Sequence, residues 1–399
     1  MRKVLLICLL LSTITSWSQT PWYELANNAN ATINEIEAAY NQQVKGLSEE
    51  KKAAYAKHFE RWYAAIAPYI LPDGHIQNRA ELYNRNALIT SHKQSPNGNW
   101  KEIGPFTARD IYRGVGRINC IAFHPTDSNI MYCGAALGGV WKTTNHGKTW
   151  EPLTDHIPNF FVTAIAVNPG NPDIIYAGTG DGNTETRYPG IGVWKSDDGG
   201  INWEQKSDLI GDQIVNDIIV HPDDNDRVIA AAHTGLYLSE SGGNKWVRLN
   251  TGRFRELRIA PDNNDIIYAS TNSTLLVSTD GGFRFTGKRL PRTPNPRLSI
   301  AVSAAEPTAI WLVSEQLVLK SDNYGDDIYE VLIGDGDRDL GGQSWYNTTA
   351  EGSPHKPGVL YQGHVPVYKT GNNGKTWKRL TNVHSDVHYM RHSPVTGRL

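Results

Sequence analysis

A short signature that recurs six times after the first quarter of the chain restricts the fold more than any other feature. Three full copies read Thr143-x-Asn145-x-Gly147-x-Thr149-Trp150, Ser196-x-Asp198-x-Gly200-x-Asn202-Trp203 and Thr370-x-Asn372-x-Gly374-x-Thr376-Trp377. Three looser copies contain Gly243, Gly282 and Gly325, and successive signature glycines are 39 to 53 residues apart. A period of this size indicates an architecture of stacked repeats.

Each signature has the composition of a tight turn. Hydroxyl and Asp/Asn side chains bond to nearby backbone groups, glycine accepts a positive φ, and the closing aromatic residue anchors the strand that follows. We therefore assign a structural role to the best-defined signature positions. They are Asn145, Gly147, Trp150, Asp198, Gly200, Trp203, Asp280, Gly282, Asn372, Gly374 and Trp377.

The segments around the signatures predict four short strands per repeat. In the second repeat, β-like runs cover 162–167 and 173–177, a third run at 193–195 leads into the signature, and Trp203 opens a fourth. Four antiparallel strands per repeat, without helical periodicity, are typical of a propeller blade. The sequence thus predicts an all-β propeller over 96–399. Asp386 to Pro394 resembles the first strand of a seventh repeat, so we expect an incomplete ring, as in a fragment of a longer protein.

The N-terminal quarter differs in composition. Arg2 and Lys3 precede an apolar run and then small polar residues, so 1–18 is predicted to be a cleaved signal peptide. Apolar residues at helical spacing predict two helices within 19–95. No later segment is long and apolar enough to cross a membrane. A secreted or cell-surface location follows.

The six signatures resemble the Asp-box, or BNR repeat, of sortilin-like (VPS10-type) propellers and of secreted bacterial proteins related to xyloglucanase-type glycosyl hydrolases. The resemblance covers roughly residues 98 to 399. It implies a propeller whose signature turns lie at the periphery, away from the central ligand-binding face. It says much less about function, because one fold supports many activities.

Two departures from the repeat are candidate binding sites. An insertion in the second repeat places Asp181, Glu185, Arg187 and Tyr188 on one loop, where they could bind a polar ligand. The second departure alternates the carboxylates of Asp335, Asp337 and Asp339 with flexible residues, which is the kind of ligand set that calcium needs. A variable solvated loop and an acidic turn are the respective alternatives. No other cofactor is predicted.

The evidence for catalysis is weaker. Leu137 to Lys142 resembles a stretch of the xyloglucan-cleaving endoglucanases in which an Asp precedes paired glycines, and that catalytic Asp would fall at Ala136. Their second propeller, which contains the partner acid, is not matched. Asp217 and Glu256 occupy equivalent positions in neighbouring repeats and are the alternative carboxylate pair. The arginine cluster and Arg-Ile-Pro segment of sialidases are not found.

Charged residues, cysteines and histidines limit the classes of partner and metal site that the sequence predicts. The net charge of −2 and the scattered Lys and Arg residues argue against nucleic acid. Cys120 and Cys133 could form a disulfide, although small buried residues are the preferred interpretation, and His384 with His388 could at most begin a zinc site. We expect an exported, non-catalytic module that binds protein, peptide or polysaccharide. The alternatives are a glycoside hydrolase and a structural spacer in a larger surface protein.

Overall fold

The computed structural model describes residues 21–26, 28, 30–77, 116–157, 160–183, 190–206, 211, 213–294, 297–333, 344–381, 383 and 386–399. The chain divides into two compact units, Met1–Gln77 and Asn78–Leu399. Each unit is described by itself.

The first unit is helical, as the spacing of its apolar residues predicts. It comprises α1 (Trp22–Leu25), α2 (Ile33–Val44), α3 (Glu49–Ile66) and the 3₁₀ turn η1 (Ala67–Tyr69). Thr32 starts α2 with a capping box, in which its hydroxyl accepts from the Glu35 amide and the Glu35 carboxylate accepts from the Thr32 amide. Trp22, Phe59 and Trp62 form the aromatic core of this unit.

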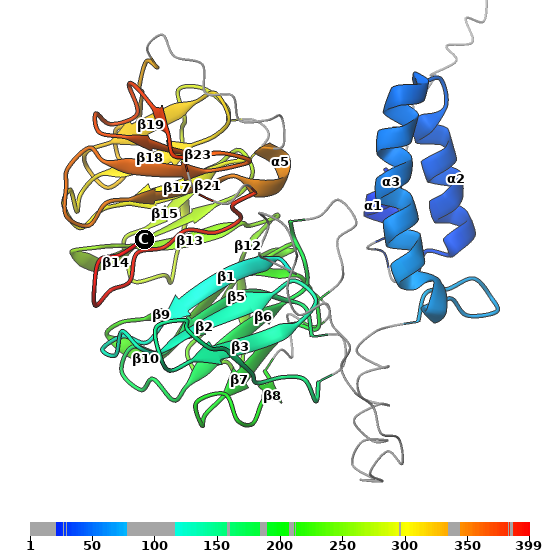
Figure 1. Ribbon diagram of the computed structural model, residues 1–399, viewed down its shortest axis with the longest axis horizontal. Helices are drawn as coiled ribbons and strands as arrows, with labels where there is room; N and C mark the ends of the chain where they lie inside the picture. The colour runs from blue at the N-terminus through cyan, green and yellow to red at the C-terminus, as the bar shows by residue number, and fades with distance from the viewer. Residues whose placement is uncertain are drawn as a thin grey trace, which may run out of the picture. The chain divides into compact units, whose positions relative to one another are not determined.

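The second unit contains six antiparallel sheets of four strands each, and this confirms the predicted propeller (Figure 1). Within every sheet the spatial order follows the chain order. The blades are β1 (Ile118–Phe123), β2 (Met131–Ala135), β3 (Gly139–Thr143), β4 (Glu151–Pro152); β5 (Val162–Val167), β6 (Ile175–Thr179), β7 (Val193–Ser196), β8 (Glu204–Gln205); β9 (Val215–His221), β10 (Asp224–Ala232), β11 (Gly235–Ser239), β12 (Val247–Thr251); β13 (Glu256–Ala260), β14 (Asn263–Ser270), β15 (Leu275–Ser278), β16 (Thr286–Lys288); β17 (Ser299–Val302), β18 (Ile310–Val313), β19 (Val318–Ser321), β20 (Tyr329–Glu330); and β21 (Thr349–Gly352), β22 (Leu360–Gly363), β23 (Val367–Thr370), β24 (Lys378–Arg379). One short helix, α5 (Ser344–Asn347), precedes β21.

The first strands of successive blades pack side by side, from β1 against β5 through to β17 against β21. These inner strands place apolar side chains between neighbouring sheets. One such cluster joins blades 2 and 3 through Tyr176, Val215 and Trp246. Burial between blades is therefore the main stabilising contribution to the ring.

A signature turn joins the third and fourth strands of each blade. In blade 2 the Ser196 hydroxyl accepts from the Gly200 amide at 2.9 Å, and Asp198 accepts from the Asn202 amide at 2.8 Å. The Trp203 indole donates to the Gly200 carbonyl at 2.9 Å, and Gly200 has a φ of +98°. The polar groups of the turn thus bond to one another and hold the fourth strand in place.

Neighbouring repeats are also linked by hydrogen bonds from a backbone amide at the start of one repeat to a side chain on the inner strand of the preceding repeat. We call this set of bonds the inter-blade belt. Its links run from the Leu257 amide to Asp217 (2.9 Å), from Ile300 to Glu256 (3.0 Å), from Ala350 to Ser299 (2.9 Å) and from His392 to Glu351 (3.3 Å).

The start of the seventh repeat forms no strand. Residues 386–394 follow blade 6, and the Val387 amide donates to the His364 carbonyl at 2.9 Å. The belt link to Glu351 reaches the same segment. The described residues give it no second strand to pair with, so a ladder of hydrogen bonds cannot develop.

Cys120 and Cys133 are both free and buried. They lie on paired strands, but Cys120 is opposite Gly134 and Cys133 is opposite Ile121. The structure therefore favours their interpretation as small core residues.

Candidate functional site

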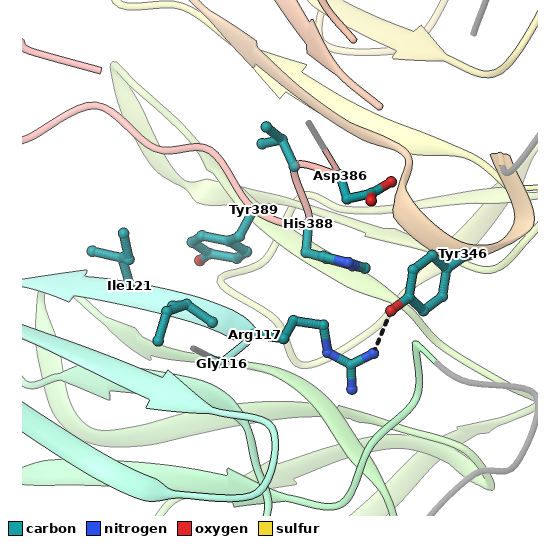
Figure 2. Close-up of a pocket in the computed structure, with 9 residues that line it drawn as sticks. Gly116, Arg117, Ile121, Tyr346, Asp386, His388 and Tyr389 are labelled. Carbon is teal, nitrogen blue, oxygen red and sulfur yellow. Dashed lines mark hydrogen bonds between the residues drawn. The ribbon is translucent and has the colours of Figure 1, made fainter. Parts of the chain in front are cut away.

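A cavity of about 400 Å³ opens where the inner strands begin. Two segments far apart in the sequence face each other across it, one at the start of β1 and one after blade 6, and α5 contributes a third side (Figure 2). The lining residues are Gly116, Arg117, Ile118, Ile121, Tyr346, Asp386, Val387, His388 and Tyr389.

Arg117 connects this cavity to the insertion of blade 2. Its guanidinium donates to the Tyr346 hydroxyl at 2.7 Å and forms an ion pair with Asp181. Asp181 is completely buried. Because its carboxylate is paired with Arg117 and shielded from solvent, these contacts favour a role for Asp181 in positioning Arg117, while ligand binding by Asp181 remains an untested prediction.

The same insertion is held by three further arginines. Arg253 and Arg255 donate to the Gly182 carbonyl at 3.3 and 2.8 Å, and Arg297 donates to the Asn183 side chain at 2.9 Å. Residues 182 and 183 of the insertion are thus fixed by side chains from the starts of blades 4 and 5.

His388 lies in the wall between Arg117 and Tyr346 (Figure 2). Its ring meets the Tyr346 ring edge to face, with centroids 4.5 Å apart and planes at 87°. Burial, together with the positive charges of Arg117 and Arg297, lowers the pKa of His388 to about 3. The imidazole is therefore neutral at physiological pH.

Among the lining residues that the structure describes, Asp386 is the only carboxylate. It is exposed, and its Oδ1 accepts from the Asn347 amide group at 3.2 Å. Its φ of +61° is unusual for a residue other than glycine, and such strain is concentrated at functional positions. An exposed carboxylate at a cavity can exchange protons with a ligand.

The alternative pair Asp217 and Glu256 does not line this cavity. The Arg258 guanidinium lies between the two carboxylates, 3.4 Å from Asp217 and 3.2 Å from Glu256, and both acids accept belt hydrogen bonds. Burial raises the pKa of Asp217, an effect that Arg258 opposes. These contacts favour a structural role, while catalysis by the pair remains an untested prediction.

Several predicted site residues lie outside the described residues. They are Glu185, Arg187, Tyr188, Asp335, Asp337, Asp339 and His384. Among the residues that the structure does describe, no group of three potential ligands is arranged to hold a metal ion. Ala136 is buried, and its amide donates to the Arg117 carbonyl at 3.0 Å.

Sequence reasoning missed Arg117, Tyr346, Asp386 and His388 as members of one site. One signal was available, because an arginine stands just before the inner strand in blades 1, 4 and 5, at Arg117, Arg255 and Arg297. Apolar or small residues would suffice there for a purely structural blade.

Fold and site together define a six-bladed β-propeller with a polar cavity at one end of the ring, related to xyloglucanases of the GH74 type. A xyloglucanase from a Paenibacillus species is 23% identical over 164 residues, which is 37% of this chain and 16% of that enzyme. An ancestral GH74 enzyme superposes with a TM-score of 0.55 at 19% identity, over 71% of this chain and 42% of that one. The GH74 xyloglucanase of Xanthomonas campestris superposes with a TM-score of 0.52 at 18% identity, over 67% of this chain and 45% of that one. No protein-family model matches the chain.

These comparisons correct the expectation of a non-catalytic binding module. The curated proteins that match the sequence are xyloglucanases, and so are enzymes. The chain spans less than a fifth of the length of these relatives and under half of the GH74 structures. In the described part of the chain, no helix is long and apolar enough to cross a membrane.

Proposed function

We propose that this propeller belongs to an exported glycoside hydrolase that acts on a polysaccharide, with xyloglucan as the first substrate to test. The observation that supports this most directly is the sequence similarity to xyloglucanases over 152 to 164 residues. The repeated turns further support an Asp-box propeller, and residues 1–18 support export through a signal peptide. N-terminal sequencing of the secreted protein tests the cleavage.

The cavity has the chemical character of a sugar site. Tyr346 and Tyr389 offer aromatic rings, Arg117 offers hydrogen-bond donors, and Asp386 offers a carboxylate at the exposed rim. Aromatic surface with a few polar groups is typical of pockets that orient a small ligand. We assign a general acid or base role to Asp386.

Glycoside hydrolysis requires a second carboxylate. Asp386 is the one acid lining the described cavity, and the resemblance to xyloglucan-cleaving endoglucanases implies that the partner acid is on a second propeller. Neither Ala136 nor the ion-paired Asp181 can provide it. Calcium binding by Asp335, Asp337 and Asp339 remains a separate proposal, and a chelator that leaves the melting temperature unchanged would refute it.

The test is release of reducing ends from xyloglucan and from mixed-linkage β-glucan by the folded protein together with the second propeller that the resemblance implies. Asp386→Asn should lower the rate by about 10²- to 10⁴-fold, which is the usual contribution of a general acid or base. Asp155→Asn is the matched control, since Asp155 is an exposed aspartate outside the cavity lining. No release by a cooperatively folded wild type would overturn the hydrolase proposal. Equal rates for the two variants would overturn the role of Asp386.

A further inference from the structure

Positive charge is concentrated around the cavity. Arg297 is only 7% exposed, and the oxygen atoms that accept from it belong to the Asn183 side chain and the Tyr346 backbone, both at 2.9 Å. Burial lowers the pKa of the Arg297 guanidinium, and the negative charge of Glu256 opposes this shift. A buried cation held by neutral acceptors is costly, and a nearby anion would stabilise it.

Two nitrogen atoms of the cavity wall also lack partners within the described residues. Arg117 uses Nη1 and Nη2 for Tyr346 and Asp181, whereas its buried Nε has no acceptor. His388, which is 8% exposed, has a buried Nδ1 without a partner. Both residues line the same cavity, so both nitrogens belong to side chains that a ligand would meet.

We propose that the cavity binds the carboxylate of an acidic sugar, a uronic acid residue of the glycan, through Arg117 and His388. This inference rests on the hydrolase proposal and specifies the substrate class. The Nε–H of Arg117, which has no acceptor among the described residues, can donate to a carboxylate, and hydrogen bonds that include a charged partner are the stronger ones. A neutral sugar would leave the buried charge of Arg297 without a carboxylate among its hydrogen-bond acceptors.

The size and the walls of the cavity favour a sugar as the bearer of that carboxylate. A volume of about 400 Å³ lies within the range of small-molecule pockets. Tyr346 and Tyr389 supply ring surface on which a pyranose can lie. Asp386 lies at the exposed rim and bonds to Asn347, whereas His388 is deeply buried, so the reacting acid and the bound carboxylate occupy different depths.

Calorimetric titration provides the test, with a xylo-oligosaccharide bearing one glucuronic acid and the same oligosaccharide without it. We expect the acidic ligand to bind at least about tenfold more tightly, with the preference weakening as salt is added. His388→Phe keeps a ring against Tyr346 and removes both nitrogens, and Arg117→Lys removes Nε while keeping the charge. Each should reduce the preference at least about threefold, whereas Arg284→Gln, which removes an exposed charge on a signature turn, should not.

A second measurement does not depend on the variants folding. Nuclear magnetic resonance titration of wild-type His388 should show its pKa rise when glucuronate is added, because an anion stabilises the imidazolium. Equal affinity for the acidic and neutral sugars, or tighter binding of a peptide C-terminal carboxylate than of glucuronate, would overturn the inference. Measuring turnover separates the two proposals. Hydrolysis of neutral glycans, without tighter binding of acidic sugars, refutes only this inference. Tighter binding of acidic sugars, without turnover of any glycan, refutes only the hydrolase proposal.

Discussion

Replacing Glu256 with alanine should destabilise the propeller strongly. Glu256 is 7% exposed and accepts from the Ser299 hydroxyl at 3.0 Å, from the Ile300 amide at 3.0 Å and from Arg258 at 3.2 Å. Its removal leaves a buried guanidinium with one carboxylate fewer and two further donors without an acceptor. Breaking such a buried pair lowers the free energy of unfolding by about 3–5 kcal/mol. Because the unfolding entropy grows with the size of the unit, Asn78–Leu399, the melting temperature should fall by roughly 4–7 °C.

Urea unfolding followed by tryptophan fluorescence measures the change. Glu240→Ala removes an exposed carboxylate from the turn that follows β11 and should change the free energy by no more than about 0.5 kcal/mol. Glu256→Gln keeps the shape of the side chain, and its loss of unfolding free energy should lie between those of Glu240→Ala and Glu256→Ala. If Glu256→Ala unfolds at the wild-type urea concentration but has lost hydrolysis of xyloglucan, the structural interpretation is wrong and Glu256 is catalytic.

Three further predictions concern other parts of the ring. In urea unfolding, Gly282→Ala should lower the free energy of unfolding more than Gly147→Ala does. Both positions have positive φ, but only at Gly282 would the new methyl group overlap the Ile229 side chain. Equal losses of free energy in the two variants would refute this. Lowering the pH from 7.5 to 5 should reduce stability, because the pKa of His388 in the folded protein, about 3, is below its ordinary value of 6.5 and the unfolded chain takes up the proton first. His388→Phe should flatten that dependence, and an unchanged slope would contradict it. Burial raises the pKa of the Cys133 thiol to about 11 and holds that of Cys120 well above its ordinary value, so neither should react with a thiol reagent at pH 8 until the protein is denatured.

The repeat signatures were sufficient to predict the fold, because each blade is built from local patterns. Alternating apolar residues in the inner strands, together with turns such as that of Ser196 to Trp203, determine four strands without information from distant residues. Blade boundaries were predictable for the same reason.

The site was not predictable to the same extent. Arg117 and Tyr346 are 229 positions apart, and the 2.7 Å hydrogen bond between them joins the segment before β1 to α5, a contact that no local pattern indicates. The insertion around Asp181 was recognised as a departure from the repeat, but its burial depends on arginines contributed by other blades. Asp217 and Glu256 are predicted as a catalytic pair because they are carboxylates at equivalent positions in neighbouring repeats. That equivalence reflects their shared place in the inter-blade belt.

The inter-blade belt has a consequence for how such rings change in evolution. In each link the acceptor side chain comes from one repeat and the next repeat contributes a backbone amide, to which a side chain of that next repeat adds a contact in three of the four links. Every residue except proline supplies that amide, so a duplicated, deleted or recombined blade can join its new neighbour without a matching substitution there. Gene segments that encode single blades are in this respect interchangeable. Propellers with different numbers of blades can then arise from one another without first losing the contact between adjacent inner strands.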